Sequence, residues 1–174
     1  MTATIKLLLV LAVITLLFFT FKTKKDKLAV GDKMPSFKLQ NQNGKWIYSN
    51  SFNGKSLVVY FYPKDDTPGC TKEACSFRDN YERFTANNVA VVGISADDIA
   101  SHKAFVAKYN LPFTLLADTD RKAHKTFGVG KALGMFTSRI TFIINDKGIV
   151  LRIFKDNINA EKHIEEALKI LKIK

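Results

Sequence analysis

The sequence is poor in cysteine and histidine, with only two of the former and three of the latter among 174 residues. Two cysteines cannot form the disulfide framework that stabilises small secreted domains. A zinc site would need more ligands at closer spacing, and His102, His124 and His163 lie far from both cysteines in the sequence. Cys70 and Cys75 share one short stretch, which favours redox chemistry over a structural cross-link.

Signatures of cofactor or nucleic-acid binding are also missing. The glycines of residues 128–134 do not form the G-x-G-x-x-G pattern that follows a strand in dinucleotide-binding domains, so we expect no cofactor there and interpret the stretch as a loop near the site. The formal net charge is +11, but the lysines are scattered, and there is no arginine-rich helix, zinc-finger or homeodomain pattern. We therefore expect a solvated, lysine-rich surface and no nucleic-acid partner.

The length and the apolar content predict one folded domain. The chain is 47% hydrophobic and contains 14 phenylalanines, which argues against disorder and provides material for a proper core. We assign residues 28–174 to this domain. Residues 1–27 form a separate hydrophobic segment with a basic linker.

An uncharged apolar run, Leu7–Phe21, lies near the N-terminus, with Lys6 before it and four lysines after it. A membrane-spanning helix needs about 20 apolar residues, a length reached by counting from Thr2 with Lys6 extended to the interface. A cleaved signal peptide is the alternative. It requires small residues after the run, where the sequence has Phe-Phe-Thr-Phe-Lys. We therefore predict a single-pass, uncleaved membrane anchor.

The orientation of this anchor follows from the flanking charge. The lysines cluster on its C-terminal flank, and positively charged flanks tend to stay in the cytoplasm. We predict a membrane-anchored protein whose catalytic domain faces the cytoplasm, with a periplasmic or extracellular domain as the alternative.

Strand and helix patterns alternate through the rest of the chain, which predicts an α/β sheet covered by helices on both faces. The expected strands are 37–39, 46–48, 57–62, 89–95, 113–117, 140–145 and 149–154. The expected helices are 71–84, 99–109, 120–127 and 160–173.

Both cysteines lie where the strand Leu57–Tyr62 gives way to the helix Thr71–Phe84. Pro63 and the Lys-Asp-Asp sequence after it end the strand. Cys70 therefore comes at or just inside a helix N-terminus, where unpaired backbone N–H groups and the helix dipole favour the thiolate form.

Pro63, Thr67 and Cys70 form a P-x-x-x-T-x-x-C motif, and Cys75 follows five residues later. From Val30 to Lys174 the chain resembles the peroxiredoxins, and within them the bacterioferritin-comigratory-protein or peroxiredoxin Q subfamily. The resemblance implies a thioredoxin-like fold with a central mixed sheet flanked by helices. It also implies a peroxidase that needs no cofactor because electrons pass through thiols.

The resemblance assigns a role to each residue of the motif. Cys70 would attack a hydroperoxide and become a sulfenic acid. Thr67 would hydrogen-bond the thiolate and the peroxide, and Pro63 would shield the site. Arg139, just before the strand of residues 140–145, would hold the thiolate and the developing negative charge. Each residue also has an alternative interpretation. Cys70 could be a buried, inert cysteine and Thr67 the N-cap of the helix. Pro63 could simply end the strand, and Arg139 could be a surface residue.

The resemblance makes Cys75 the resolving cysteine, which would form an intramolecular disulfide with Cys70. On an ideal helix their Cα atoms lie roughly 8–9 Å apart, whereas a disulfide needs about 4.4–6.8 Å. The first turns of the helix would have to unwind in each cycle. Thioredoxin or a similar dithiol protein would then reduce the disulfide, and we expect the protein to be a monomer. The alternative is a helix cysteine that never reacts.

Two other functions are the alternatives to a peroxidase. A thiol–disulfide oxidoreductase of the same fold normally carries C-x-x-C, whereas the spacing here is C-x-x-x-x-C. In a membrane-tethered thioredoxin-like module the cysteines would be incidental, which the combination of Thr67, Cys70 and Arg139 argues against.

Overall fold

The computed structural model describes residues 28–132, 134 and 136–174, so the predicted anchor and linker at residues 1–27 lie outside the described part of the chain. The strands are β1 (Lys38–Asn41), β2 (Trp46–Tyr48), β3 (Ser56–Phe61), β4 (Val89–Ser95), β5 (Thr114–Ala117), β6 (Lys131–Ala132), β7 (Phe136–Thr137), β8 (Ile140–Ile144) and β9 (Val150–Lys155). The helices are the 3₁₀ turn η1 (Ser49–Phe52), α2 (Pro68–Asp79), α3 (Tyr81–Ala86), α4 (Ile99–Tyr109), α5 (Lys122–Thr126) and α6 (Glu161–Ile170).

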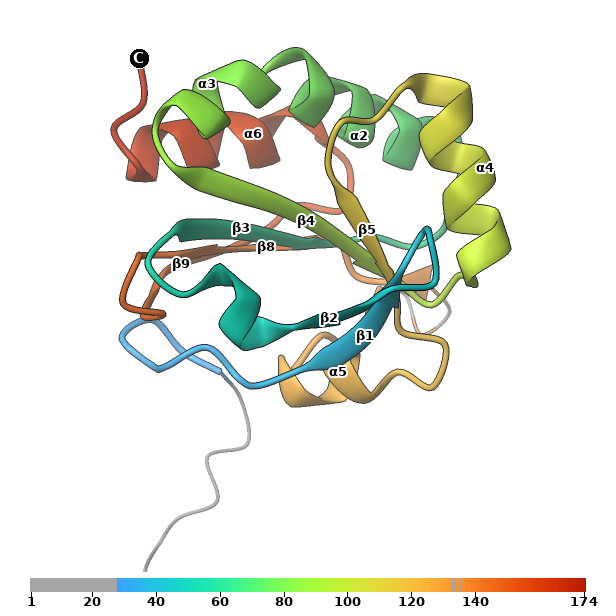
Figure 1. Ribbon diagram of the computed structural model, residues 1–174, viewed down its shortest axis with the longest axis horizontal. Coiled ribbons are helices and arrows are strands. Elements are labelled where there is room, and N and C mark those ends of the chain that lie inside the picture. The colour runs from blue at the N-terminus through green and yellow to red at the C-terminus, as the bar shows by residue number, and fades with distance from the viewer. Residues whose placement is uncertain (1–27, 133, 135) are drawn as a thin grey trace, which may run out of the picture.

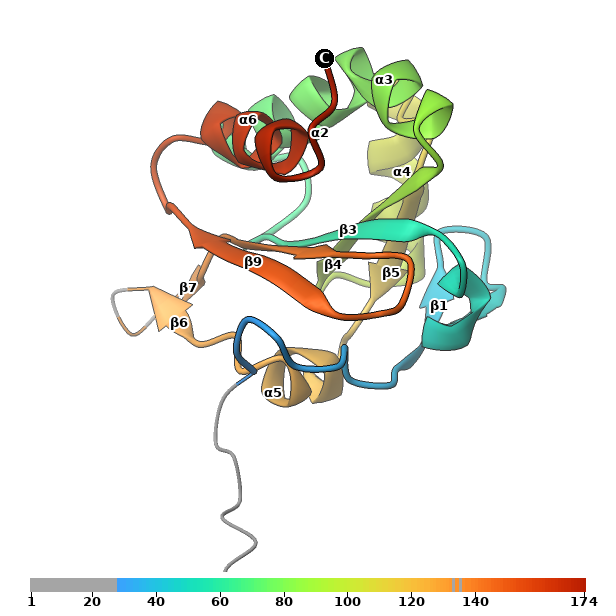
Figure 2. The ribbon, with the colours of Figure 1, turned by 90° about the vertical axis from the view of Figure 1, so that its left-hand side faces the viewer.

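A seven-stranded mixed sheet organises the domain, in the order β2-β1-β5-β4-β3-β8-β9. The strands β3, β4 and β5 run parallel to one another, whereas β8 pairs antiparallel with β3 and β9 antiparallel with β8. The helices α2, α3, α4 and α6 lie over one face, and α5 lies on the other (Figures 1 and 2). The predicted mixed α/β sheet is confirmed.

The central strand β3 is buried on both faces, which explains its continuous apolar sequence. Its side chains alternate between two cores. Val58 and Tyr60 pack in a core with residues of α2, α4 and α6, while Leu57 and Val59 pack on the opposite side with residues of α5. Because β3 is packed on both faces, its C-terminal end is held in place, and this end leads into α2, the helix that carries both cysteines.

A glycine in β4 makes room for one of these buried rings. Gly93 pairs with Tyr60 across the parallel ladder. A Cβ atom at Gly93 would lie 2.6 Å from a methyl group of Leu115 and 2.7 Å from the Tyr60 ring. Only glycine fits there without a shift of the core.

Most predicted elements agree with the observed ones within two or three residues, and β4 and α4 have the predicted bounds. The single helix predicted for residues 71–84 is instead divided into α2 and α3. Asn80 interrupts it with φ −105° and ψ 6°, and its side chain donates a hydrogen bond to the Ser76 carbonyl, 2.9 Å away. The stretch 128–134, predicted to be a loop, contains the short strand β6, which pairs with β7.

Candidate active site

Cys70 is the third residue of α2 and is almost completely buried, at 2% exposure. The helix begins at Pro68, whose fixed φ and missing N–H suit the first helical position. A thiol at this place faces the end of the helix where backbone N–H groups lack helical partners.

The sheet topology brings Arg139 to this cysteine from 69 residues away in the sequence. Ile140, the first residue of β8, pairs with Phe61, the last residue of β3. Arg139 therefore lies at the edge of the sheet from which the chain passes through Pro63 to Cys70. Its Nη2 atom lies 3.4 Å from the Cys70 sulfur, and the side chain is buried rather than on the surface.

A glycine permits this close approach. A Cβ atom at Gly69 would lie 3.2 Å from Arg139 Nη2, tighter than most such contacts. The other terminal nitrogen of the guanidinium, Nη1, donates a hydrogen bond to Glu73 and forms a buried salt bridge with it. One cation therefore faces two acidic groups, the Cys70 thiol and the Glu73 carboxyl.

Glu73 was not predicted as a site residue. It is fully buried, one helical turn after Cys70 on α2. Burial raises the pKa of its carboxyl to about 8, although Arg139 acts in the opposite direction. The sequence contained one signal: position 73 falls on the same helix face as the apolar Ala74 and Phe77.

A neutral histidine, His163, lies beside the Glu73 carboxyl. His163 Nε2 donates to the carbonyl oxygen of Asp156, 2.8 Å away, and Thr141 Oγ1 donates to Nδ1 at 2.7 Å. Burial lowers the pKa of His163 to about 4, so the ring stays neutral. The Oε1 atom of Glu73 lies 3.7 Å from Nδ1 and finds no hydrogen-bond donor among the described residues. This arrangement explains why the carboxylate form is disfavoured.

Replacement of Glu73 by glutamine is expected to change how stability depends on pH. The folded wild type binds the Glu73 proton more tightly than the unfolded chain, whose carboxyl titrates near about 4.3. The free energy of unfolding of the wild type should therefore fall as pH rises from about 5 to 8, by up to about 1.4 kcal/mol per pH unit. The free energy of unfolding of E73Q should not show this fall. Melting temperatures across this range measure it.

Glu161→Gln is a matched control for this experiment, because Glu161 is exposed and pairs with Lys72 at the surface. The melting temperature of E161Q should follow that of the wild type at every pH. Parallel curves for E73Q and the wild type would show that Glu73 is ionised throughout and would contradict the expectation.

The structure places Thr67 at the N-cap position of α2, but its side chain makes no capping hydrogen bond there. Its hydroxyl donates instead to the Lys64 carbonyl oxygen, 3.0 Å away. Thr67 is therefore the N-cap residue, as the alternative interpretation held, but its hydroxyl does not cap the helix because this bond turns it back toward the preceding loop. Pro63 is half-buried and follows directly after the buried Tyr62 at the end of β3.

Cys75 lies on the same unbroken helix as Cys70, half-buried, and both cysteines are free thiols. The five-residue spacing on this helix matches the geometry that excludes a disulfide without unwinding. Within the described part of the chain, no group of three or more histidine, cysteine, aspartate or glutamate side chains is arranged to hold a metal ion.

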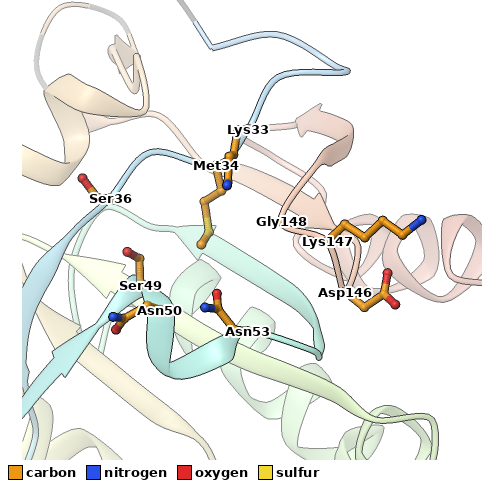
Figure 3. A pocket seen from close by; sticks show the side chains of 9 residues that line it. All are labelled: Lys33, Met34, Ser36, Ser49, Asn50, Asn53, Asp146, Lys147 and Gly148. Atoms are coloured by element: carbon orange, nitrogen blue, oxygen red, sulfur yellow. The ribbon is translucent and has the colours of Figure 1, made fainter.

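A separate surface pocket lies near the start of β3, and Figure 3 shows the residues that line it. It has a volume of about 380 Å³ and is lined by Lys33, Asn53, Asp146 and Gly148 among others. These residues flank the start of β3 and the turn between β8 and β9. None of the predicted site residues lines this pocket, so it is distinct from the cysteine site.

Comparison with known proteins identifies relatives over most of the chain. Residues 30–153 match the AhpC/TSA family. Chloroplastic peroxiredoxin Q of Populus jackii is 51% identical over 146 residues, which cover 83% of this chain and 68% of the relative. Its counterpart from Arabidopsis thaliana is 48% identical over 147 residues, covering 84% and 68%.

Solved structures of peroxiredoxins also resemble this chain in fold. The peroxidoxin BcpB of Mycobacterium tuberculosis superposes with a TM-score of 0.77 at 32% identity, covering 83% of this chain and 97% of that one. Peroxiredoxin Q of Xanthomonas campestris gives a TM-score of 0.73 at 31% identity, covering 78% and 89%. The thioredoxin-like fold predicted from the motif is confirmed.

The predicted membrane-anchored, single-pass location is wrong. The plant relatives are chloroplastic proteins by name, and within residues 28–132, 134 and 136–174 no helix is long and apolar enough to cross a membrane. The predicted anchor helix itself falls at residues outside this part.

Proposed function

Because the chain belongs to the AhpC/TSA family as a peroxiredoxin, and so is a thiol-dependent peroxidase, we propose that its Cys70 reduces hydrogen peroxide and organic hydroperoxides to water and alcohols. The observation that carries this proposal is the contact between Arg139 Nη2 and the Cys70 sulfur, 3.4 Å long, at the N-terminus of α2. A guanidinium donor and a helix N-terminus both favour a thiolate at that position.

In the first chemical step, the Cys70 sulfur attacks one oxygen of the hydroperoxide. The S–O bond forms as the O–O bond breaks, and the other oxygen leaves with a proton as water or alcohol. The sulfur is oxidised by two electrons to a sulfenic acid. Arg139 stabilises the negative charge that develops on the peroxide oxygens, Thr67 orients the peroxide by hydrogen bonding, and Pro63 limits access of water.

Cys75 completes the cycle as the resolving cysteine. Its thiol attacks the Cys70 sulfenic acid, so that an S–S bond forms and water leaves. The first turns of α2 unwind to allow this approach, because the intact helix holds the two residues too far apart. Thioredoxin or a similar dithiol protein then reduces the disulfide by exchange. Since both cysteines lie on one helix, a single chain suffices, and we propose a monomer.

A single oxidative turnover in the absence of reductant tests this assignment. With one equivalent of hydroperoxide, the wild type should lose both thiols and stay at monomer mass, because the disulfide is intramolecular. Cys75→Ser should consume the same first equivalent but retain a sulfenic acid that a nucleophilic trapping reagent captures. Mass spectrometry reads both products.

Two outcomes would contradict the cycle. If wild-type protein formed covalent dimers, the disulfide would be intermolecular. If Cys75→Ser turned over with thioredoxin as fast as the wild type, Cys75 would have no resolving role and the reductant would act on the sulfenic acid directly.

A further inference from the structure

The loop between β3 and α2 is tied to α4 through two consecutive aspartates, Asp65 and Asp66. This loop carries Pro63 and Thr67 and leads directly to Cys70. Asp65 points into the protein and Asp66 lies at its surface. Both side chains end on α4, the helix that follows β4 on the same side of the sheet as α2 (Figure 1).

Asp65 makes the inner attachment. Its carboxylate accepts hydrogen bonds from the Tyr62 hydroxyl at 2.6 Å and the Ser101 hydroxyl at 2.8 Å, and it pairs with His102 Nδ1 at 2.8 Å. Its backbone N–H donates to Asp97, just before α4, at 2.9 Å. Such a buried network is costly to break because each group would be left without a partner.

Asp66 makes the outer attachment. Lys108 Nζ binds both of its carboxylate oxygens, at 2.9 and 2.6 Å, and the Tyr109 hydroxyl donates to one of them at 2.6 Å. The hydrogen bond from Lys108 lowers the pKa of the Asp66 carboxyl. Asp66 has a left-handed backbone with φ +53°, a conformation that fixes the direction of the chain just before Thr67.

The helix α4 provides a firm base for these attachments. Phe105 and His102 are buried under it, and the Phe105 ring packs edge-on against Tyr109. Arg78, near the C-terminal end of α2, donates a hydrogen bond to the Tyr109 carbonyl at 2.8 Å. The last turn of α4 therefore contacts the chain both before α2 and near its end.

The first turns of α2 after Cys70 have a weaker outer attachment. Lys72 pairs with Glu161 of α6 through one exposed contact, whereas Asp66, which is exposed to a similar degree, accepts three hydrogen bonds from Lys108 and Tyr109. The chain before Cys70 is thus held by α4, whereas the segment between Cys70 and Cys75 must move if a disulfide is to form.

We propose that Lys108 and Tyr109 are positioning residues for the peroxide reaction, which they support by holding the loop of residues 63–67 in place through Asp66. This inference rests on the proposed function. The anchored loop keeps Thr67 and Cys70 in the reactive arrangement, and confines unwinding to the turns of α2 that follow Cys70. The attachment favours the step at the peroxide and contributes nothing to the step that forms the disulfide.

The double variant Lys108→Met/Tyr109→Phe tests the proposal without changing the loop itself. Both replacements keep the apolar parts of the side chains and remove the groups that bind Asp66. Lys122→Met is the control, because Lys122 forms an equally short ion pair with Asp120, 2.6 Å long, on the surface away from this loop.

Three measurements on full-length reduced protein separate the effects. Rapid mixing with one equivalent of hydroperoxide gives the rate of peroxide loss, acid quenching gives the rate of disulfide formation, and hydrogen exchange reports opening of residues 63–71. In K108M/Y109F we expect peroxide loss to slow about tenfold, as for a misplaced reacting group, with disulfide formation unchanged or faster and exchange in the loop increased. K122M should match the wild type.

An equal slowing of both steps, with a lower melting temperature, would reveal a merely structural role and overturn the proposal. Unchanged peroxide loss in K108M/Y109F would also overturn it. A failure of the proposed function would look different, because the wild type and K122M would then consume no peroxide either.

Discussion

Replacement of Cys70 by serine is expected to lower peroxide consumption by roughly 10³-fold or more, the largest effect of any single substitution in this protein. The serine hydroxyl is nearly isosteric with the thiol, so the contact with Arg139 and the start of α2 should survive. A hydroxyl stays protonated at neutral pH and is a weak nucleophile toward peroxide oxygen. The loss would therefore reflect missing chemistry and not a missing fold. The measurement is peroxide consumption with thioredoxin and its reductase.

Two controls accompany C70S. Its thermal unfolding should resemble that of the wild type, which excludes a folding defect. Cys75→Ser should still consume one equivalent of peroxide per chain, which separates the attacking thiol from the resolving one. Peroxide turnover by C70S at a rate near that of the wild type would refute the assignment of Cys70 as the nucleophile.

The sheet could be predicted from the sequence because its signals are local. The predicted strand Val89–Ser95 contains no polar residue before Ser95, as expected for a strand covered on both faces, and it forms β4. The helix α4 has the predicted bounds, with Asp98 accepting a capping hydrogen bond from the Ser101 backbone at its start and Asn110 in the left-handed conformation at its end. Such patterns depend on neighbours within a few residues.

The break at Asn80 was missed for the same reason. The spacing of apolar residues continues from Phe77 through Tyr81 to Phe84, which suits one helix. The Asn80 side chain donates a hydrogen bond to the Ser76 carbonyl, which competes with the backbone hydrogen bonds of the helix. The spacing of apolar residues gives no sign of this bond.

Of the residues around Cys70, only those that belong to the family motif could be predicted from the sequence. Glu73 falls on the apolar face of its helix, but glutamate is almost never fully buried unless it is paired, and the local pattern names no partner. Its partner, Arg139, lies 66 residues away and reaches it through the pairing of β8 with β3. The Asp65–His102 pair spans 37 residues in the same way. Contacts between residues so far apart in the sequence depend on how the strands are ordered and paired, and a pattern within a few residues gives no information about that.

Removal of the Arg139 guanidinium should have the second-largest effect. In Arg139→Met we expect the rate constant of Cys70 with hydroperoxide to fall about 10²–10³-fold, the typical loss when one donor to a developing negative charge is removed. Rapid-mixing kinetics with reduced protein measure it. Arg139→Lys should lose at least about tenfold, because a lysine presents a point charge and cannot serve Cys70 and Glu73 with two separate N–H groups.

The pairing with Glu73 makes this prediction sharper. If Arg139 acts on Cys70 directly, E73Q should retain most of the rate, and R139M/E73Q should be as slow as R139M. If Arg139 served only as the buried hydrogen-bond partner of Glu73, the double variant should recover wild-type kinetics, since neither member of the pair would remain. The contact of 3.4 Å to the sulfur favours the first result. Recovery in the double variant would reduce Arg139 to a hydrogen-bond partner of Glu73 and leave the helix N-terminus as the principal support of the thiolate.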